Sequence, residues 1–72
     1  MSKKKFTQLL IQTRERKHLL KKDVAKMFGW TPMYYGRYEK SELFPTQINI
    51  KVFSNFLEID VKELEKILED KK

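Results

Sequence analysis

The chain has 72 residues, the size of one small domain with a core that is marginal for a monomer. It contains no cysteine, which excludes disulfides and thiolate zinc sites and suits a reducing cytoplasm, and its one histidine cannot form a metal or catalytic centre alone. Since there is also no Gly-rich phosphate loop and no apolar stretch long enough for a signal sequence or a membrane span, we expect no enzyme activity, cofactor, metal or membrane insertion.

The net charge of +6 is unevenly distributed along the chain. Residues 1–40 carry eleven Lys and Arg against three acidic residues, a net charge of +8, whereas residues 41–72 have a net charge of −2. A basic half of this kind is typical of a phosphate-binding surface. At its start we expect residues 1–5 to be a flexible basic arm, which either lies along a DNA groove or only solvates the end of the chain. Its lysines are Lys3, Lys4 and Lys5.

The first helix is expected over about residues 6–17, where apolar residues recur at the spacing of one buried face. Two short helices, over about 21–28 and 32–40, follow with a tight turn between them. Gly29 can supply the positive φ that ends the first of these two, and Thr31 followed by Pro32 is a strong helix start. This arrangement predicts a helix-turn-helix unit.

Helical periodicity assigns two faces to the helix over 32–40. Tyr35 and Tyr38 point inward, whereas Met33, Arg37 and Lys40 point outward. On the flank of the outward face Gly36 costs about 1 kcal/mol relative to Ala, so it is either a tolerated surface glycine or a point of close approach to a nucleic-acid backbone.

Two lysines begin the helix over 21–28, where positive charge opposes the helix dipole. Lys21 and Lys22 are explained if they and the helix end meet a phosphate together, although exposed lysines also tolerate this position.

From Gln47 to Leu57 the pattern is ambiguous, because β-branched residues alternate as in a strand while Ile50, Phe53 and Leu57 form a helical face. Read as a helix over about 46–57, this segment has a second apolar face. Such a face in water indicates a partner, and we expect it to form a dimer or partner interface: Phe44, Ile48, Val52 and Phe56. A last helix over 61–70 contributes Val61 and Leu64 to the core.

From about Leu10 to Leu64 the chain resembles the Cro/phage-repressor (Xre-type) helix-turn-helix family. The segment 14–17 resembles the end of the family's first helix, 19–25 its second helix, 29–31 its turn and 35–39 its recognition helix. The segments 45–46 and 59–61 resemble the starts of its last two helices. The resemblance implies an all-α, compact five-helix repressor-like domain over residues 6–72. It also implies a helix over 46–57.

The resemblance also implies a set of DNA contacts, with residues 32–40 in the major groove. The family's base-contacting positions fall on Pro32, Met33, Gly36 and Arg37, and its phosphate-contacting position falls on Lys21. From the residues themselves we expect further backbone contacts from Lys22, Thr31, Tyr34 and Lys40.

The chain departs from the family pattern at several positions. His18 and Ser41 stand where the family usually has Gly, Leu20 replaces a Ser or Thr cap, and Thr13 replaces an aliphatic core residue. In addition, residues 32 and 33 cannot make the bidentate contacts to adenine that Gln or Asn makes.

Two hypotheses for the function follow. The first is a sequence-specific regulator that binds double-stranded DNA as a homodimer, a repressor of a phage, plasmid or other mobile element in the cytoplasm of a bacterial or phage-infected cell. The alternative is a protein-interaction module, antitoxin-like or an accessory factor, which binds a second protein through the apolar face of residues 44–56. The basic half of the chain favours DNA.

Overall fold

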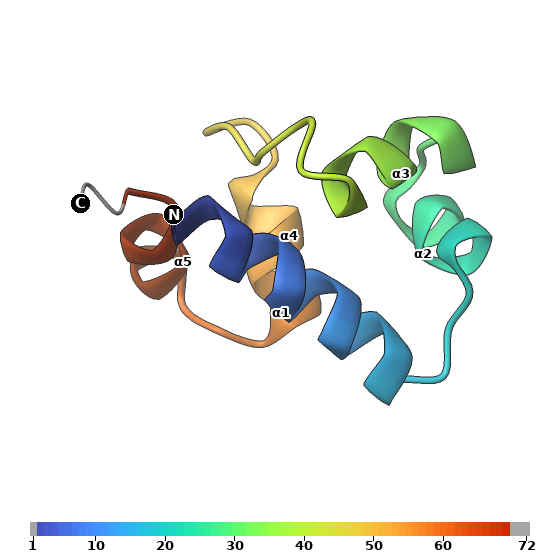
Figure 1. Cartoon of the computed structure of the whole chain (residues 1–72), viewed down its shortest axis with the longest axis horizontal. Helices are drawn as coiled ribbons and strands as arrows, with labels where there is room; N and C mark the ends of the chain where they lie inside the picture. The colour runs from blue at the N-terminus through green and yellow to red at the C-terminus, as the bar shows by residue number, and fades with distance from the viewer. Residues whose placement is uncertain (1, 70–72) are drawn as a thin grey trace.

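The computed structural model describes residues 2–69, and the side chains of residues 4–69. The helices are α1 (Ser2–Arg16), α2 (Lys21–Phe28), α3 (Pro32–Glu39), α4 (Ile50–Leu57) and α5 (Val61–Glu69). In Figure 1, α1 crosses in front of α4, α5 lies beside the first half of α1, and α2 and α3 form the opposite end of the molecule. Residues 2–69 contain no strand, so the all-α prediction is confirmed and the strand alternative is wrong.

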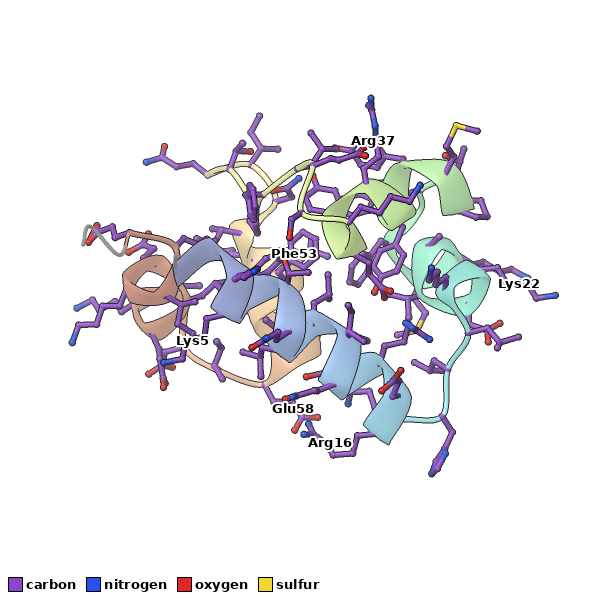
Figure 2. The ribbon with its side chains drawn as sticks, viewed as in Figure 1. Lys5, Arg16, Lys22, Arg37, Phe53 and Glu58 are labelled. Carbon is purple, nitrogen blue, oxygen red and sulfur yellow. The ribbon has the colours of Figure 1, made fainter. Side chains whose placement is uncertain are left out.

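The core is centred on Phe53 of α4, which is fully buried (Figure 2). The rings of Phe6 and Phe28 both meet it edge-on, each with ring centroids 5.4 Å from its own. Tyr35 and Tyr38 are buried at 0% and 2% exposure, which confirms that they are core residues. Because these rings come from α1, α2, α3 and α4, one aromatic cluster holds the helix-turn-helix against the rest of the domain.

The turn between α2 and α3 forms as the sequence predicts. Gly29 ends α2 in the left-handed conformation at φ 79°, and the amide of Trp30 donates to the carbonyl of Ala25 at 2.8 Å. Thr31 precedes α3, and its Oγ1 accepts a hydrogen bond from the amide of Tyr34 at 3.1 Å. The local sequence therefore sets both ends of this turn.

Helix α1 begins at Ser2, four residues earlier than predicted. Lysine is a good helix former, and neither Gly nor Pro interrupts residues 2–5, so the helix continues back through them. The prediction of a flexible arm over residues 1–5 is therefore wrong for residues 2–5, while Met1 lies outside the described residues. At their other ends α1, α3 and α5 agree with the prediction to within one residue, and residue 70 is also outside the described part.

Helix α4 begins at Ile50 and not near Pro45 and Thr46, so this predicted start is wrong. The residue before it, Asn49, has φ −115° and ψ 11°, so its backbone is not α-helical. The side-chain Oδ1 of Asn49 accepts a hydrogen bond from the backbone amide of Thr46 at 2.9 Å, and the backbone amide of Asn49 donates to the Thr46 carbonyl at 3.2 Å. This local bonding holds a turn where the helix would otherwise start. Ile48 consequently lies in the turn and not on a helical face.

Three non-glycine residues adopt a positive φ within the described chain, namely His18 at 59°, Ser41 at 62° and Glu58 at 61°. The first two occupy positions where the sequence departs from the glycine of the family. Glu58 was not anticipated. It ends α4, and its carboxylate accepts a hydrogen bond from Lys17 Nζ at 2.9 Å, which lowers the pKa of Glu58.

Candidate nucleic-acid interface

The outer face of α3 is accessible along its length. The side chain of Met33 is 82% exposed, Pro32, Arg37 and Lys40 are exposed, and Gly36 is half-buried between them. The opposite face carries the buried Tyr35 and Tyr38. The two faces of this helix are therefore those predicted from the periodicity, and the four expected base-contact residues lie on one helix.

Gly36 has helical geometry and an open environment. A Cβ atom placed on it would meet nothing within 4 Å. Packing inside the domain therefore does not require glycine at this position. A requirement for glycine at this position would come from a molecule that binds here.

Arg37 extends away from the body of the molecule at the outer side of α3 (Figure 2). Its Nε lies 3.6 Å from Oε1 of Glu42, and both side chains are more than half exposed, at 57% and 55%. An exposed ion pair of this kind contributes little to stability. The guanidinium can therefore exchange this carboxylate for another acceptor at small cost.

The start of α2 presents a second basic site. Lys21 and Lys22 are exposed, and Lys22 points outward from the end of the molecule that α2 and α3 form (Figure 2). Leu20 supplies no side-chain cap, and the carboxylate of Asp23 accepts a hydrogen bond from the Leu20 amide at 2.9 Å. Among the described residues of the first turn of α2, Asp23 is the one acidic side chain, and it offsets part of the positive charge at this helix end.

The lysines of the expected arm are placed differently. Lys4 and Lys5 are exposed on the first turns of α1, and Figure 2 places Lys5 far from Arg37, near the start of α1. The side chain of Lys3 lies outside the described residues.

A buried ion pair fixes the end of α3 to α1. Glu39, 8% exposed, accepts hydrogen bonds from Arg14 Nε at 2.6 Å and Arg14 Nη2 at 3.3 Å, and from the hydroxyl of Tyr35 at 2.5 Å. Arg14 Nη1 also donates to the Leu19 carbonyl at 3.0 Å. The hydrogen bond to Glu39 raises the pKa of Arg14, and burial raises the pKa of Tyr35. The sequence does not predict this pair, because the two residues are 25 positions apart and only the fold brings them together.

The predicted apolar interface does not form one continuous face. Phe56 is 6% exposed and packs edge-on against Phe28 with ring centroids 5.5 Å apart, so its assignment to an outer face is wrong. Phe44 is half-buried against Phe6. Val52 and Ile48 remain accessible, at 36% and 92%. The core side of α4 is wider than a single stripe, and the late start of α4 removes Ile48 from the helix.

Val52 also lines a shallow groove between α2 and α4. The remaining lining residues are Met27, Phe28, Asn55 and Phe56. Met27 is 61% exposed at its edge.

Within residues 2–69 no helix is long and apolar enough to cross a membrane. The same part of the chain holds no group of three or more side chains that could ligate a metal ion.

Comparison with known families agrees with this geometry. The helix-turn-helix family model of the Cro/phage-repressor type matches residues 10–64, which is most of the chain. The chain therefore belongs to this family, and it is a DNA-binding helix-turn-helix regulator. No curated protein and no solved structure matches it significantly.

Proposed function

We propose that the protein is a sequence-specific transcriptional repressor of a phage, plasmid or other mobile element, which acts in the cytoplasm and binds double-stranded DNA as a homodimer. The exposed outer face of α3 is the observation that carries this proposal. It offers Arg37, the one guanidinium on this helix, with Met33 and Gly36 beside it. Arginine is suited to the O6 and N7 of guanine, and the methionine side chain to the methyl group of thymine.

Backbone contacts flank this face in the proposed complex. Lys21 and Lys22 meet phosphate at the start of α2, together with the free amides of that helix end. Thr31 and Tyr34 lie at the start of α3, and Lys40 follows its end. These contacts fix the position of α3 in the groove, whereas the base contacts determine the sequence.

The geometry of the duplex supports the proposed homodimer. Recognition helices of a twofold dimer enter successive major grooves about 34 Å apart. The domain is 32 Å long, so one copy cannot span this distance with a second reading helix. We propose Ile48 as the centre of the dimer contact, because it is the most exposed of the large apolar side chains, at 92%. In Figure 1 its loop extends along the upper edge of the molecule away from α3, so a contact there leaves α3 free.

In-vitro selection of duplexes from a random library by the purified chain tests the function. The expected product is a pair of inverted half-sites one helical turn apart, each with a conserved guanine that Arg37 reads. Recovery of unrelated sequences, with no enrichment over the library, would contradict sequence-specific binding.

Sedimentation at micromolar concentration tests the dimer. Ile48→Glu should give a folded monomer with much weaker binding to the two-half-site duplex, whereas the matched charge in Met27→Glu should leave the dimer intact. If Met27→Glu or Val52→Glu dissociates the dimer instead, the contact lies at the groove between α2 and α4. A monomeric wild type that binds no duplex and captures a second protein would support the alternative, a protein-interaction module.

A further inference from the structure

A chain of side-chain hydrogen bonds runs from the loop before α4 to the first turn of α3. Asn49 Nδ2 donates to the hydroxyl of Tyr38 at 3.1 Å, and this hydroxyl lies 2.9 Å from the hydroxyl of Tyr34. Tyr38 is 2% exposed, and Tyr34 is half-buried at the edge of the helix. The chain thus passes from the interior to the flank of the proposed DNA-reading face.

The direction of these bonds is set at the loop. The amide of Thr46 can only donate, and it donates to Oδ1 of Asn49 at 2.9 Å. The other side-chain atom of Asn49, Nδ2, therefore faces Tyr38. A side-chain amide nitrogen is a donor only, so the oxygen of Tyr38 must be the acceptor in this contact.

Among the described hydrogen bonds, the hydroxyl proton of Tyr38 then has one acceptor, the oxygen of Tyr34. A buried hydroxyl proton without an acceptor is costly, and the oxygen of Tyr34 is the remaining partner in reach. Burial also raises the pKa of Tyr38 to about 12, so this proton is present at neutral pH. Tyr34 is consequently an acceptor toward the interior, and its own proton is left to bond outward.

We propose that Tyr34 donates a hydrogen bond to a DNA phosphate oxygen, and that Tyr38 and Asn49 are positioning residues that orient its proton. The inference rests on the proposed function, and it adds two residues that never touch DNA to the binding machinery. A chain in which each hydroxyl accepts one bond and donates the next also strengthens the last donor, because successive bonds polarise one another.

The rings hold the two hydroxyls in place. Trp30 stacks on Tyr38 with ring centroids 5.3 Å apart and planes 13° apart, and the ring of Tyr34 meets Trp30 edge-on at 4.9 Å. Replacement of either tyrosine by Phe keeps these ring contacts and removes only the hydroxyl. The single tryptophan provides a fluorescence signal that checks the packing of each variant.

A double-mutant cycle on binding to a selected duplex tests the proposal. Tyr34→Phe should weaken the affinity about tenfold, the effect of one hydrogen bond to a charged group, without a change in the salt dependence, because no charge is lost. Tyr38→Phe should cause a smaller loss, and the double variant should bind no more weakly than Tyr34→Phe alone. One phosphate per half-site, when replaced by an uncharged methylphosphonate, should weaken the wild type and not Tyr34→Phe.

Equal affinity of wild type and Tyr34→Phe for the selected duplex would overturn the proposal and leave the DNA-binding function intact. A loss in Tyr38→Phe that persists unchanged in the Tyr34→Phe background would show that Tyr38 acts through packing. A wild type that binds no duplex overturns the proposed function as well.

The hydroxyl protons of the free protein give an independent test by NMR. The Tyr38 proton should exchange slowly and the Tyr34 proton rapidly, and the reverse order would contradict the assigned direction.

Discussion

Replacement of Gly36 by alanine should stabilise the protein and weaken its binding to DNA. The first effect follows from the free chain. Gly36 lies inside α3 with helical geometry, and an added Cβ meets no atom within 4 Å. Alanine in a helix interior is favoured over glycine by about 1 kcal/mol, which corresponds to a rise in the melting temperature of roughly 4–8 °C for a domain of this size. Thermal unfolding followed by circular dichroism measures this rise.

The second effect follows from the position of Gly36 on the proposed interface. A Cβ at this point of α3 projects into the space that the DNA would occupy, so Gly36→Ala should weaken the affinity for a selected duplex although the protein is more stable. Gly29→Ala is the matched control. Gly29 has φ 79°, so alanine there should destabilise the fold. A Gly36→Ala variant that is more stable and binds the selected duplex as tightly as the wild type would refute the close approach, and the glycine would then be a tolerated surface residue.

Four further changes have defined outcomes. Arg37→Ala should cost about 1–3 kcal/mol of binding free energy and relax the preference at one base pair per half-site in repeated selection, and unchanged preferences would exclude this role. Neutralising Lys21 and Lys22 should reduce the slope of log K against log salt by roughly one unit per lost phosphate contact, whereas an unchanged slope would mean that the lysines are only solvated. Thr13→Val should raise the free energy of unfolding in urea by about 1 kcal/mol, because Oγ1 of Thr13 is fully buried without a hydrogen-bond partner. The raised pKa of Tyr35 favours its protonated form in the folded state, so its contribution to stability is complete below pH 10 and is lost as the pH rises above that value. In urea unfolding, the free energy of unfolding should fall less between pH 7 and pH 11 for Tyr35→Phe than for the wild type.

The sequence predicts the helix-turn-helix in detail because its signals are local. Gly29, Thr31 and Pro32 act on their own backbone, and the helical period separates Tyr35 from Arg37 without knowledge of the rest of the fold. The turns at His18 and Ser41 are also predicted from their positions in the chain. The backbone adopts a positive φ at both residues although neither is glycine.

The remaining features depend on contacts between distant segments or on competition that a pattern does not reveal. Phe56 looks like an outer residue when one narrow stripe is assumed, but the ring of Phe28 packs edge-on against it and Lys17 Nζ lies 5.7 Å from its ring centroid. The start of α4 depends on whether Asn49 bonds to Thr46 or the helix extends, and both are compatible with the sequence. The ion pair of Arg14 and Glu39 requires the packing of α1 against α3.

Contacts between α3 and the rest of the domain would determine how this helix meets DNA in the proposed complex. The helix has eight residues, among them three tyrosines and a glycine, so its intrinsic tendency to be helical is weak. Its conformation therefore depends on contacts with other parts of the fold. Near its C-terminal end Glu39 pairs with Arg14 of α1, and the hydroxyl of Tyr38 accepts a hydrogen bond from Asn49. A buried ion pair adds little net stability, but loss of one partner leaves an uncompensated charge and strongly destabilises the fold. Residues on the inner side of α3 consequently control the placement of Met33, Gly36 and Arg37, and changes there should lower DNA affinity without removal of any DNA contact.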